Sequence, residues 1–518
     1  MTRFFRLLPI LIGLTLGASL PPSLAPDPQV PFVWTSAERV PEYHDLLRSP
    51  LLAADSGGTV HAFDIELHDQ GQYAVMHRRW TPDGGWLSPT DVLLPGYLGV
   101  APLLQSVAID GQDRIHLVYH GGDPQGQSVY YTSANASEAD SALAWSEPEP
   151  VGNYAAGVAA ASLAVNADGD LVLLYGGDRF GEGLYGTVSR DHGASWSEPS
   201  LLSRVPGEEL WPADVFLVSD DEGRFHVVWG TVNTQGLNEV VRYARLEADL
   251  STWTHGAVLA EIDNSLELLG APGIVASPDE LVVVYEDGFP PTKYVRRSAD
   301  FGESWSTPVR PFPHIGGYGR PALVTDSTGT VHLIVGNRLP DPETYGMWYS
   351  RLVGDHWLPL QPVSSGPGAP GFGPCCGQAV VVGGNLLLAA WAHNVSSDFL
   401  TGAWSAYAWL DAPGQAHESS AGESGAGEGL TQPVPTAARS TPTPTPVAGA
   451  RSSSEQPAAP LDSAGPIPVG LPIYLGIIPV AILAGYLIVR RLGHPAAPVG
   501  EHGDEQAPDD GAGREHDG

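Results

Sequence analysis

Short apolar segments alternate with polar turns along the chain, and one such pattern occurs seven times. Each copy has an apolar run, a Gly- or Asp-containing turn and a second run rich in Val, Leu, Tyr and Trp, as in "QSVAIDGQDRIHLVY". This pattern indicates β-hairpins rather than helices. A period of 49 to 57 residues predicts an all-β, seven-bladed β-propeller with four strands per blade. The equivalent turn positions are Asp55, Asp110, Asn166, Asp220, Ser277, Asp326 and Gly383.

The two ends of the repeat predict how the ring closes. The seventh copy has a third strand at "GAWSAYAWL", after which the chain enters low-complexity sequence, so its fourth strand is missing. Near the N-terminus, "FVWTSAERV" has the pattern of a fourth strand but no blade of its own. We therefore expect the segment around residues 34–40 to complete blade seven, which removes the open sheet edges. On this basis seven blades are favoured over six.

Two later turns of the repeat share the pattern S-x-D-x-G-x-S-W. The Asp side chain is expected to accept backbone N–H bonds, Gly to supply an unusual dihedral angle, and Trp to fill the gap between sheets. Weaker versions surround Asp83 and precede Trp253 and Trp357. The turns are predicted to stabilise the fold rather than to bind a ligand. They consist of Ser189, Asp191, Gly193, Ser195 and Trp196, and of Ser298, Asp300, Gly302, Ser304 and Trp305.

This pattern resembles the Asp box of BNR-repeat proteins in the sialidase-like β-propeller superfamily. The resemblance implies that these turns lie on the face away from the ligand site, and that sialidase-type exoglycosidase activity is one alternative. Sialidases open with Arg-Ile-Pro, and Arg48 and Pro50 match that opening in position, although Ser49 replaces isoleucine. The family also implies three arginines on the substrate carboxylate, an Asp acid/base and a Tyr/Glu pair. Arg179, Arg320 and Arg338 are positional candidates for the other arginines, and the catalytic residues remain unassigned.

One face of the predicted propeller gathers the turns between second and third strands and the connections between blades. Acids, amides, arginines and aromatic residues occur there, as a polar ligand such as a sugar would need. Any solvated propeller face has a similar composition, so the two interpretations stay open. The ligand-face candidates are Arg48, Asp123, Asp178, Arg179, Asp287, Tyr318, Arg320, Arg338, Cys375 and Cys376.

The only two cysteines, Cys375 and Cys376, are adjacent in the sequence. Export favours their oxidation, but neighbouring Cα atoms lie about 3.8 Å apart, which is below the usual disulfide range. A vicinal disulfide would offer a rigid apolar ledge to a ring-shaped ligand; a structural turn or two thiols are the alternatives. No second Cys pair or clustered His motif accompanies them in the sequence, so neither a metal nor a cofactor is expected.

Segments outside the repeat predict a single-pass membrane protein. Residues 1–25 have the composition of a signal peptide, and residues 30–411 form the predicted propeller. Residues 412–465 are a disordered stalk rich in Pro, Ser, Thr and Gly. Residues 466–489 form a transmembrane helix, and the tail at 490–518, which opens with two arginines, is acidic and cytoplasmic. The propeller would then lie outside the cell.

The net charge of −34, with Lys293 as the only lysine, argues against binding to nucleic acid or anionic head groups. We therefore expect a cell-surface propeller that recognises an extracellular glycan or protein, and binding is favoured over catalysis. A sialidase-type glycoside hydrolase and a structural component of the surface or envelope are the alternatives. The sequence names neither the ligand nor the oligomeric state.

Overall fold

A computed structural model describes the propeller and parts of its loops. The predicted signal peptide, the transmembrane helix, the tail and all but the first residue of the stalk lie outside the described residues. Within the described residues, no helix is long and apolar enough to cross a membrane. The described ranges are 32–44, 49–67, 72–94, 102–123, 126–153, 160–177, 183–204, 210–233, 238–254, 256–262, 269–317, 319–339, 341–369, 374–393 and 402–412.

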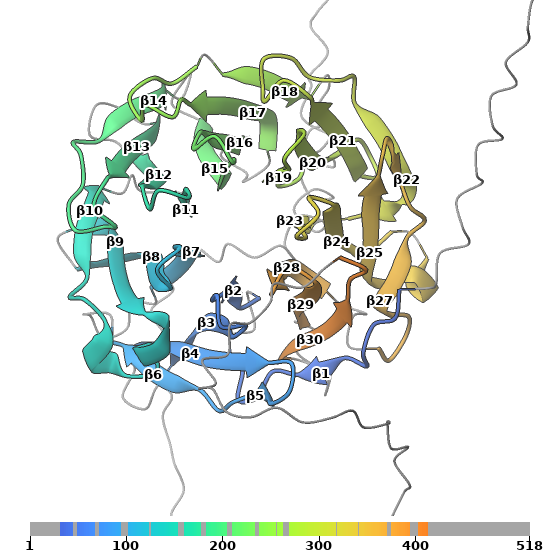
Figure 1. Cartoon of the computed structure of the whole chain (residues 1–518). Helices are drawn as coiled ribbons and strands as arrows, with labels where there is room; N and C mark the ends of the chain where they lie inside the picture. The colour runs from blue at the N-terminus through green and yellow to red at the C-terminus, as the bar shows by residue number, and fades with distance from the viewer. Residues whose placement is uncertain are drawn as a thin grey trace, which may run out of the picture. The chain divides into compact units, whose positions relative to one another are not determined.

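Seven antiparallel sheets stand around a central axis, so the predicted seven-bladed propeller is confirmed (Figure 1). Blade one comprises β2 (Leu51–Ala54), β3 (Val60–Leu67), β4 (Tyr73–Thr81), β5 (Gly85–Trp86) and β6 (Thr90–Leu93). Blade two comprises β7 (Leu103–Ile109), β8 (Arg114–Asp123), β9 (Gly126–Asn135), η1 (Ala136–Glu138), η2 (Ala142–Ala144) and β10 (Glu149–Asn153). Blade three comprises β11 (Ala161–Val165), β12 (Leu171–Gly177), β13 (Gly183–Ser189) and β14 (Ser200–Arg204).

The remaining blades follow the same order from the axis outwards. Blade four comprises β15 (Leu210–Ser219), β16 (Phe225–Asn233), β17 (Asn238–Leu246) and β18 (Ala257–Glu261). Blade five comprises β19 (Gly273–Ala276), β20 (Leu281–Asp287), β21 (Thr292–Ser298) and β22 (Val309–Gly316). Blade six comprises β23 (Ala322–Thr325), β24 (Val331–Asn337), η3 (Pro342–Thr344), β25 (Gly346–Val353), β26 (His356–Trp357) and β27 (Gln361–Ser365). Blade seven comprises β28 (Pro374–Val382), β29 (Leu386–His393), β30 (Gly402–Trp409) and β1 (Glu38–Arg39).

The N-terminal segment closes the ring, as predicted. In β1, Glu38 pairs with Ser405 and Arg39 with Trp404 of β30. The backbone N–H of Thr35 also donates to the carbonyl of Tyr407. Figure 1 shows β1, from the start of the chain, beside β30, from the end of the propeller. Blade seven therefore has four strands, and its outer edge is covered.

Strand register gives the propeller two distinct faces. In blade three, Leu171 pairs with Ser189 at one end of the hairpin, and Gly177 pairs with Gly183 at the other. The first-to-second and third-to-fourth strand turns therefore lie on one face, which we call the Asp-turn face. The second-to-third strand turns lie on the opposite face, which we call the mouth face.

The hydrophobic core lies between neighbouring blades, and one tryptophan from each blade packs on the blade before it. Trp196 of blade three contacts Tyr131 edge-on with ring centroids 5.1 Å apart, and Trp305 contacts Tyr243 in the same way at 4.9 Å. The N-terminal Trp34 contacts Tyr349 of blade six at 5.5 Å, so it supplies the tryptophan of blade seven. The other four are Trp86, Trp145, Trp253 and Trp357.

A buried Asp–His–Tyr chain occurs in blades two, four and six. In blade two, the two ring nitrogens of His116 lie 3.3 Å from Asp110 Oδ2 and 2.7 Å from Tyr131 Oη. A neutral imidazole satisfies both partners when Nε2–H donates to Asp110 and the tyrosine hydroxyl donates to Nδ1. Burial lowers the pKa of His116 to about 4, which keeps the ring neutral at pH 7. His226 and His332 occupy the equivalent positions.

The two S-x-D-x-G-x-S-W turns lie on the Asp-turn face. In the first, Asp191 Oδ1 accepts the Ser195 N–H at 2.8 Å and the Ser189 hydroxyl at 2.7 Å. Gly193 has a φ of 86°, and a Cβ atom there would lie 1.9 Å from Tyr131 Oη. Glycine is therefore required both by the backbone conformation and by the close approach of blade two. The second turn, at Ser298, Asp300, Gly302 and Trp305, repeats these contacts against Tyr243.

Replacing Trp196 by alanine is expected to lower the free energy of unfolding by roughly 2 kcal/mol, because the indole is only partly buried at the contact between blades. Urea denaturation of the full-length chain measures the change. Trp409→Ala is the control, since Trp409 is 58% exposed, and it should shift stability by about 0.5 kcal/mol or less. Equal shifts for the two variants would contradict the inter-blade role of Trp196.

Candidate functional site

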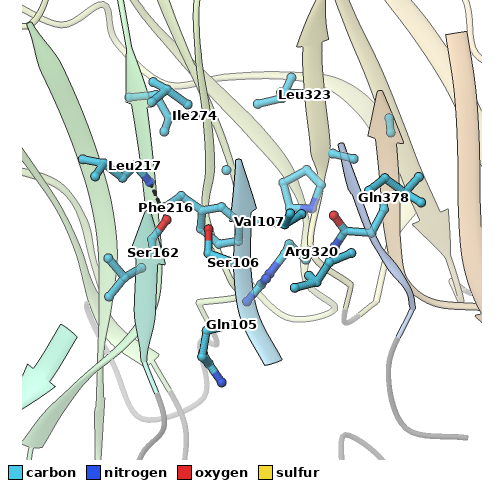
Figure 2. Close-up of a pocket in the computed structure, with 18 of the residues that line it drawn as sticks. Gln105, Ser106, Val107, Ser162, Phe216, Leu217, Ile274, Arg320, Leu323 and Gln378 are labelled. Atoms are coloured by element: carbon cyan, nitrogen blue, oxygen red, sulfur yellow. Dashed lines mark hydrogen bonds between the residues drawn. The ribbon is translucent and has the colours of Figure 1, made fainter. Parts of the chain in front are cut away.

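The inner strands of all seven blades surround an axial cavity of about 270 Å³. Most of the residues that line it are apolar, such as Val107, Leu163 and Leu323, although polar atoms form the larger part of the wall's surface. Figure 2 shows the polar side chains that lie among them. They are Gln105, Ser106, Ser162, Arg320 and Gln378.

The two serines of this wall hold neighbouring blades together. Ser106 Oγ accepts the backbone N–H of Leu163, and Ser162 Oγ accepts that of Leu217, each at 3.1 Å. These hydroxyls connect blades two to three and three to four. These hydrogen bonds give both serines a structural role. The two glutamines and Arg320 are therefore the candidates for contact with a ligand.

Arg320 is the only charged side chain among the described residues that line the cavity. It precedes β23, at the mouth-face end of the inner strand of blade six. Its guanidinium carbon lies 4.2 Å from the ring centroid of Phe216 in blade four, in cation–π geometry. Arg320 Nη2 lies 3.6 Å from Asp214 Oδ1, and both side chains are about one-third exposed (31% and 30%). The stacking fixes the guanidinium plane while part of it still faces solvent.

Asp214 is held in an unusual backbone conformation. Its φ is 48°, and the pairing of β15 with β16 is irregular between Ala213 and Phe216. The side chain of Asn238 donates to Asp214 Oδ2 at 3.1 Å, so the other carboxylate oxygen faces Arg320. A positive φ is strained for a residue other than glycine. An irregularity in strand pairing changes the direction in which a side chain points. Here the bulge directs Asp214 towards Arg320.

This arrangement suits a ligand that is both polar and anionic. A guanidinium forms a planar pair of hydrogen bonds with a carboxylate, and primary amides such as those of Gln105 and Gln378 both donate and accept hydrogen bonds. Phe216 already covers one face of the guanidinium, so a ligand would bind along its edge. Arg320 is the one cation of the described cavity wall, and Asp214, 3.6 Å from its Nη2 atom, offsets part of its charge.

Three ligand-face candidates have described side chains. Arg320 lines the cavity, whereas Asp287 ends β20 opposite Thr292. Arg338 is partly buried next to the connection between blades five and six; burial lowers the pKa of its guanidinium even though Tyr345 opposes the shift. Arg338 and Asp287 are not among the cavity-lining residues.

The other ligand-face candidates stay predictions. Arg48, Asp178, Arg179 and Tyr318 lie outside the described residues. Asp123 ends β8, and Cys375 and Cys376 belong to β28, but their side chains are not described. Among the described residues, no cluster of three or more His, Cys, Asp or Glu side chains could hold a metal ion.

Four residues of the site were missed by the sequence analysis: Gln105, Asp214, Phe216 and Gln378. All lie in inner strands, where the repeat pattern predicts only buried or alternating positions. The glutamines interrupt apolar runs in β7 and β28, and this was the one signal available for them. No sequence signal identified Asp214, because the strand irregularity that orients its side chain is not visible in the residue pattern.

No protein-family model matches the sequence, and no curated protein matches it. Many solved structures are similar in fold, and three of them, all at low identity, illustrate the match. The polysaccharide lyase Uly1 is 11% identical with a TM-score of 0.49, and the match covers 75% of this chain and 94% of the lyase. A Dyadobacter fermentans protein of unknown function is 15% identical with a TM-score of 0.47, covering 73% and 100%. The Hadza microbial sialidase Hz136 is 10% identical with a TM-score of 0.41, covering 64% and 73%.

Proposed function

We propose that this propeller is a recognition domain that binds a carboxylate-bearing glycan at the mouth-face end of its axial cavity. One observation carries the proposal: the single charged side chain of the described cavity wall is Arg320, stacked on Phe216 and faced by Asp214. A guanidinium selects a carboxylate, and the neighbouring amides suit the hydroxyl groups of a sugar.

Binding is favoured over hydrolysis by what the described wall contains. A sialidase-type reaction would need further arginines and a pair of catalytic groups beside Arg320. The described lining residues include one arginine and no Asp, Glu or Tyr. The one described carboxylate paired with Arg320, that of Asp214, also accepts a hydrogen bond from Asn238. The proposal also places the propeller outside the cell, anchored by residues 466–489, and the support for this is the signal-peptide composition of residues 1–25 and the apolar C-terminal stretch.

Arg320→Gln is expected to weaken binding of an acidic glycan at least tenfold, because the charged contact to the carboxylate is lost. The full-length chain, purified in detergent, would be applied to an array of sialylated, uronate-containing and neutral glycans. Arg310→Gln is the matched control, since Arg310 is exposed on the outer strand β22.

Two outcomes would overturn the proposal. Equal binding by Arg320→Gln and the unaltered chain would remove Arg320 from the site. Release of free sugar from a bound sialoside, lost in Arg320→Gln, would replace recognition with the hydrolase alternative.

A further inference from the structure

The only lysine of the chain, Lys293, is buried inside blade five. Its side chain has no exposed surface, and that of its partner Glu286 is 1% exposed. Lys293 Nζ lies 2.8 Å from Glu286 Oε1 and donates a hydrogen bond of 2.6 Å to the carbonyl oxygen of Gly319. Gly319 directly precedes Arg320. The buried ion pair is therefore one hydrogen bond away from the proposed ligand-binding residue.

The connection that carries Arg320 is held from both neighbouring blades. At its start, the Gly316 N–H donates to Asn337 Oδ1 at 3.1 Å, and the Gly316 carbonyl accepts the Arg338 N–H at 2.9 Å. These contacts come from blade six. Lys293 holds the other end from blade five. The connection that precedes Arg320 is thus held by hydrogen bonds at two residues, Gly316 and Gly319.

Stability alone does not account for the Lys293–Glu286 pair. Removing two charges from water is costly, and well-packed apolar residues often replace a buried pair without loss of stability. What an apolar pair cannot do is donate to the Gly319 carbonyl. The carboxylate of Glu286 also packs tightly against the backbone at Gly270. A Cβ atom at that position would lie 2.6 Å from Glu286 Oε2.

We infer that Lys293 and Glu286 are positioning residues for Arg320: Glu286 is the counter-ion of Lys293 inside the blade, and Lys293 fixes the Gly319 carbonyl. The inference rests on the proposed function of Arg320. Its consequence is that the guanidinium is held over Phe216 before any ligand arrives, so that binding does not have to order the connection. Preorganisation of this kind raises affinity by lowering the entropic cost of binding.

The test replaces the pair rather than one partner. Lys293→Met alone would leave Glu286 buried and uncompensated, and is expected to unfold the blade. The double variant Glu286→Leu/Lys293→Met keeps the interior apolar but removes the donor to Gly319. The matched control is Glu280→Leu/Arg297→Met, which removes the ion pair at the opposite end of the same hairpin, together with the Arg297 contact to Asp355. Glu286→Gln is the intermediate variant, since it leaves the Lys293 donor in place but removes its counter-ion.

The first measurement needs no ligand. Hydrogen exchange of the peptide covering residues 316–321, and modification of Arg320 by phenylglyoxal, are followed in the full-length chain. Glu286→Leu/Lys293→Met is expected to accelerate both at least tenfold, and the control pair should stay near the unaltered rates. Glu286→Gln should fall between them, because Lys293 keeps its donor to Gly319 but loses its counter-ion. Unchanged exchange in a folded Glu286→Leu/Lys293→Met variant would overturn the inference.

The second measurement titrates the same variants with sialyllactose and with trigalacturonate. The Glu286→Leu/Lys293→Met variant is expected to bind the preferred probe about tenfold more weakly, while the control pair binds as before. Faster exchange with unchanged affinity would also overturn the positioning role. If the unaltered chain binds neither probe, the proposed function fails, and the exchange data alone decide whether Lys293 orders the connection.

Discussion

Replacing Arg78 by alanine is expected to lower the free energy of unfolding by roughly 3–5 kcal/mol, because it breaks a buried ion pair on one side only. Both Arg78 and its partner Asp64 are 1% exposed. Arg78 Nε donates to the carbonyl of Pro41 at 2.9 Å, and Nη2 donates to that of Glu42 at 2.6 Å. Burial lowers the pKa of Arg78 to about 10, so the guanidinium is still charged at neutral pH and alanine would leave Asp64 without its counter-ion.

The loss should spread beyond blade one. The carbonyls of Pro41 and Glu42 belong to the segment that follows β1, and β1 completes blade seven. Arg78 of blade one therefore binds the segment that directly follows β1. This contact links blade one to the strand that completes blade seven. Once the closing segment detaches, blade seven exposes an open edge, so we expect cooperative unfolding of the ring rather than local fraying.

Urea denaturation followed by tryptophan fluorescence and by far-UV circular dichroism measures this effect. The adjacent Arg79→Ala is the control: its ion pair with Asp140 is at the surface, with the two side chains 34% and 41% exposed. That variant should lose about 1 kcal/mol or less. If Arg78→Ala and Arg79→Ala unfold at the same urea concentration, Arg78 does not secure the ring closure.

The blades could be predicted because their determinants are local and repeated. A turn residue such as Asp110 and a tryptophan such as Trp196 recur at fixed distances from the hairpins, so seven weak signals support each other. The closing role of residues 34–40 followed from counting strands, and Trp34 repeats the inter-blade contact of Trp305. The alternation of Asp–His–Tyr chains was not predicted, because it appears only when the histidine and tyrosine strands are paired.

The site was less predictable because its contacts join distant blades. Arg320 could be identified from its place between two blades, but its contacts with Phe216 and Asp214 depend on ring curvature and on the irregularity in β15. Lys293 was noticed only as the single lysine of the chain. Its partner Glu286 lies opposite it in the β20–β21 register, and the Gly319 carbonyl approaches through a connection with no regular pattern.

Acidification from pH 6.5 towards pH 4 is expected to destabilise the propeller by several kcal/mol. Burial lowers the pKa of His77 to about 3 and that of His116 to about 4, from an ordinary value of 6.5. As the pH falls, the unfolded chain takes up protons that the folded chain cannot, so stability is complete above pH 6.5 and lost below it. At 1.36 kcal/mol per pKa unit, His116 alone contributes on the order of 3 kcal/mol by pH 4. Burial likewise lowers the pKa of His226.

The carboxylates of the same chains extend the loss to lower pH. Burial alone would raise the pKa of Asp220 and Asp326, but their hydrogen bonds together outweigh it and lower both values to about 2. The donors are His226 and Arg224 for Asp220, and His332 and Thr328 for Asp326. Their contribution is present above the ordinary aspartate pKa of 3.8 and is lost as the pH falls towards 2. Stability is therefore lost in two successive pH ranges. The histidines take up protons from pH 6.5 to 4, and the aspartates from pH 4 to 2.

The midpoint of urea denaturation, measured at intervals from pH 7.5 to pH 4, tests the histidine window. His116→Gln is expected to be less stable at pH 7.5, because it shortens the link between Asp110 and Tyr131, but to lose less stability on acidification, because one buried titrating group is gone. His314→Gln serves as the control, since His314 is exposed on β22 and should keep the pH dependence of the unaltered chain. An identical slope in His116→Gln and the unaltered chain would show that the buried Asp–His–Tyr chain is not what makes the fold acid-sensitive.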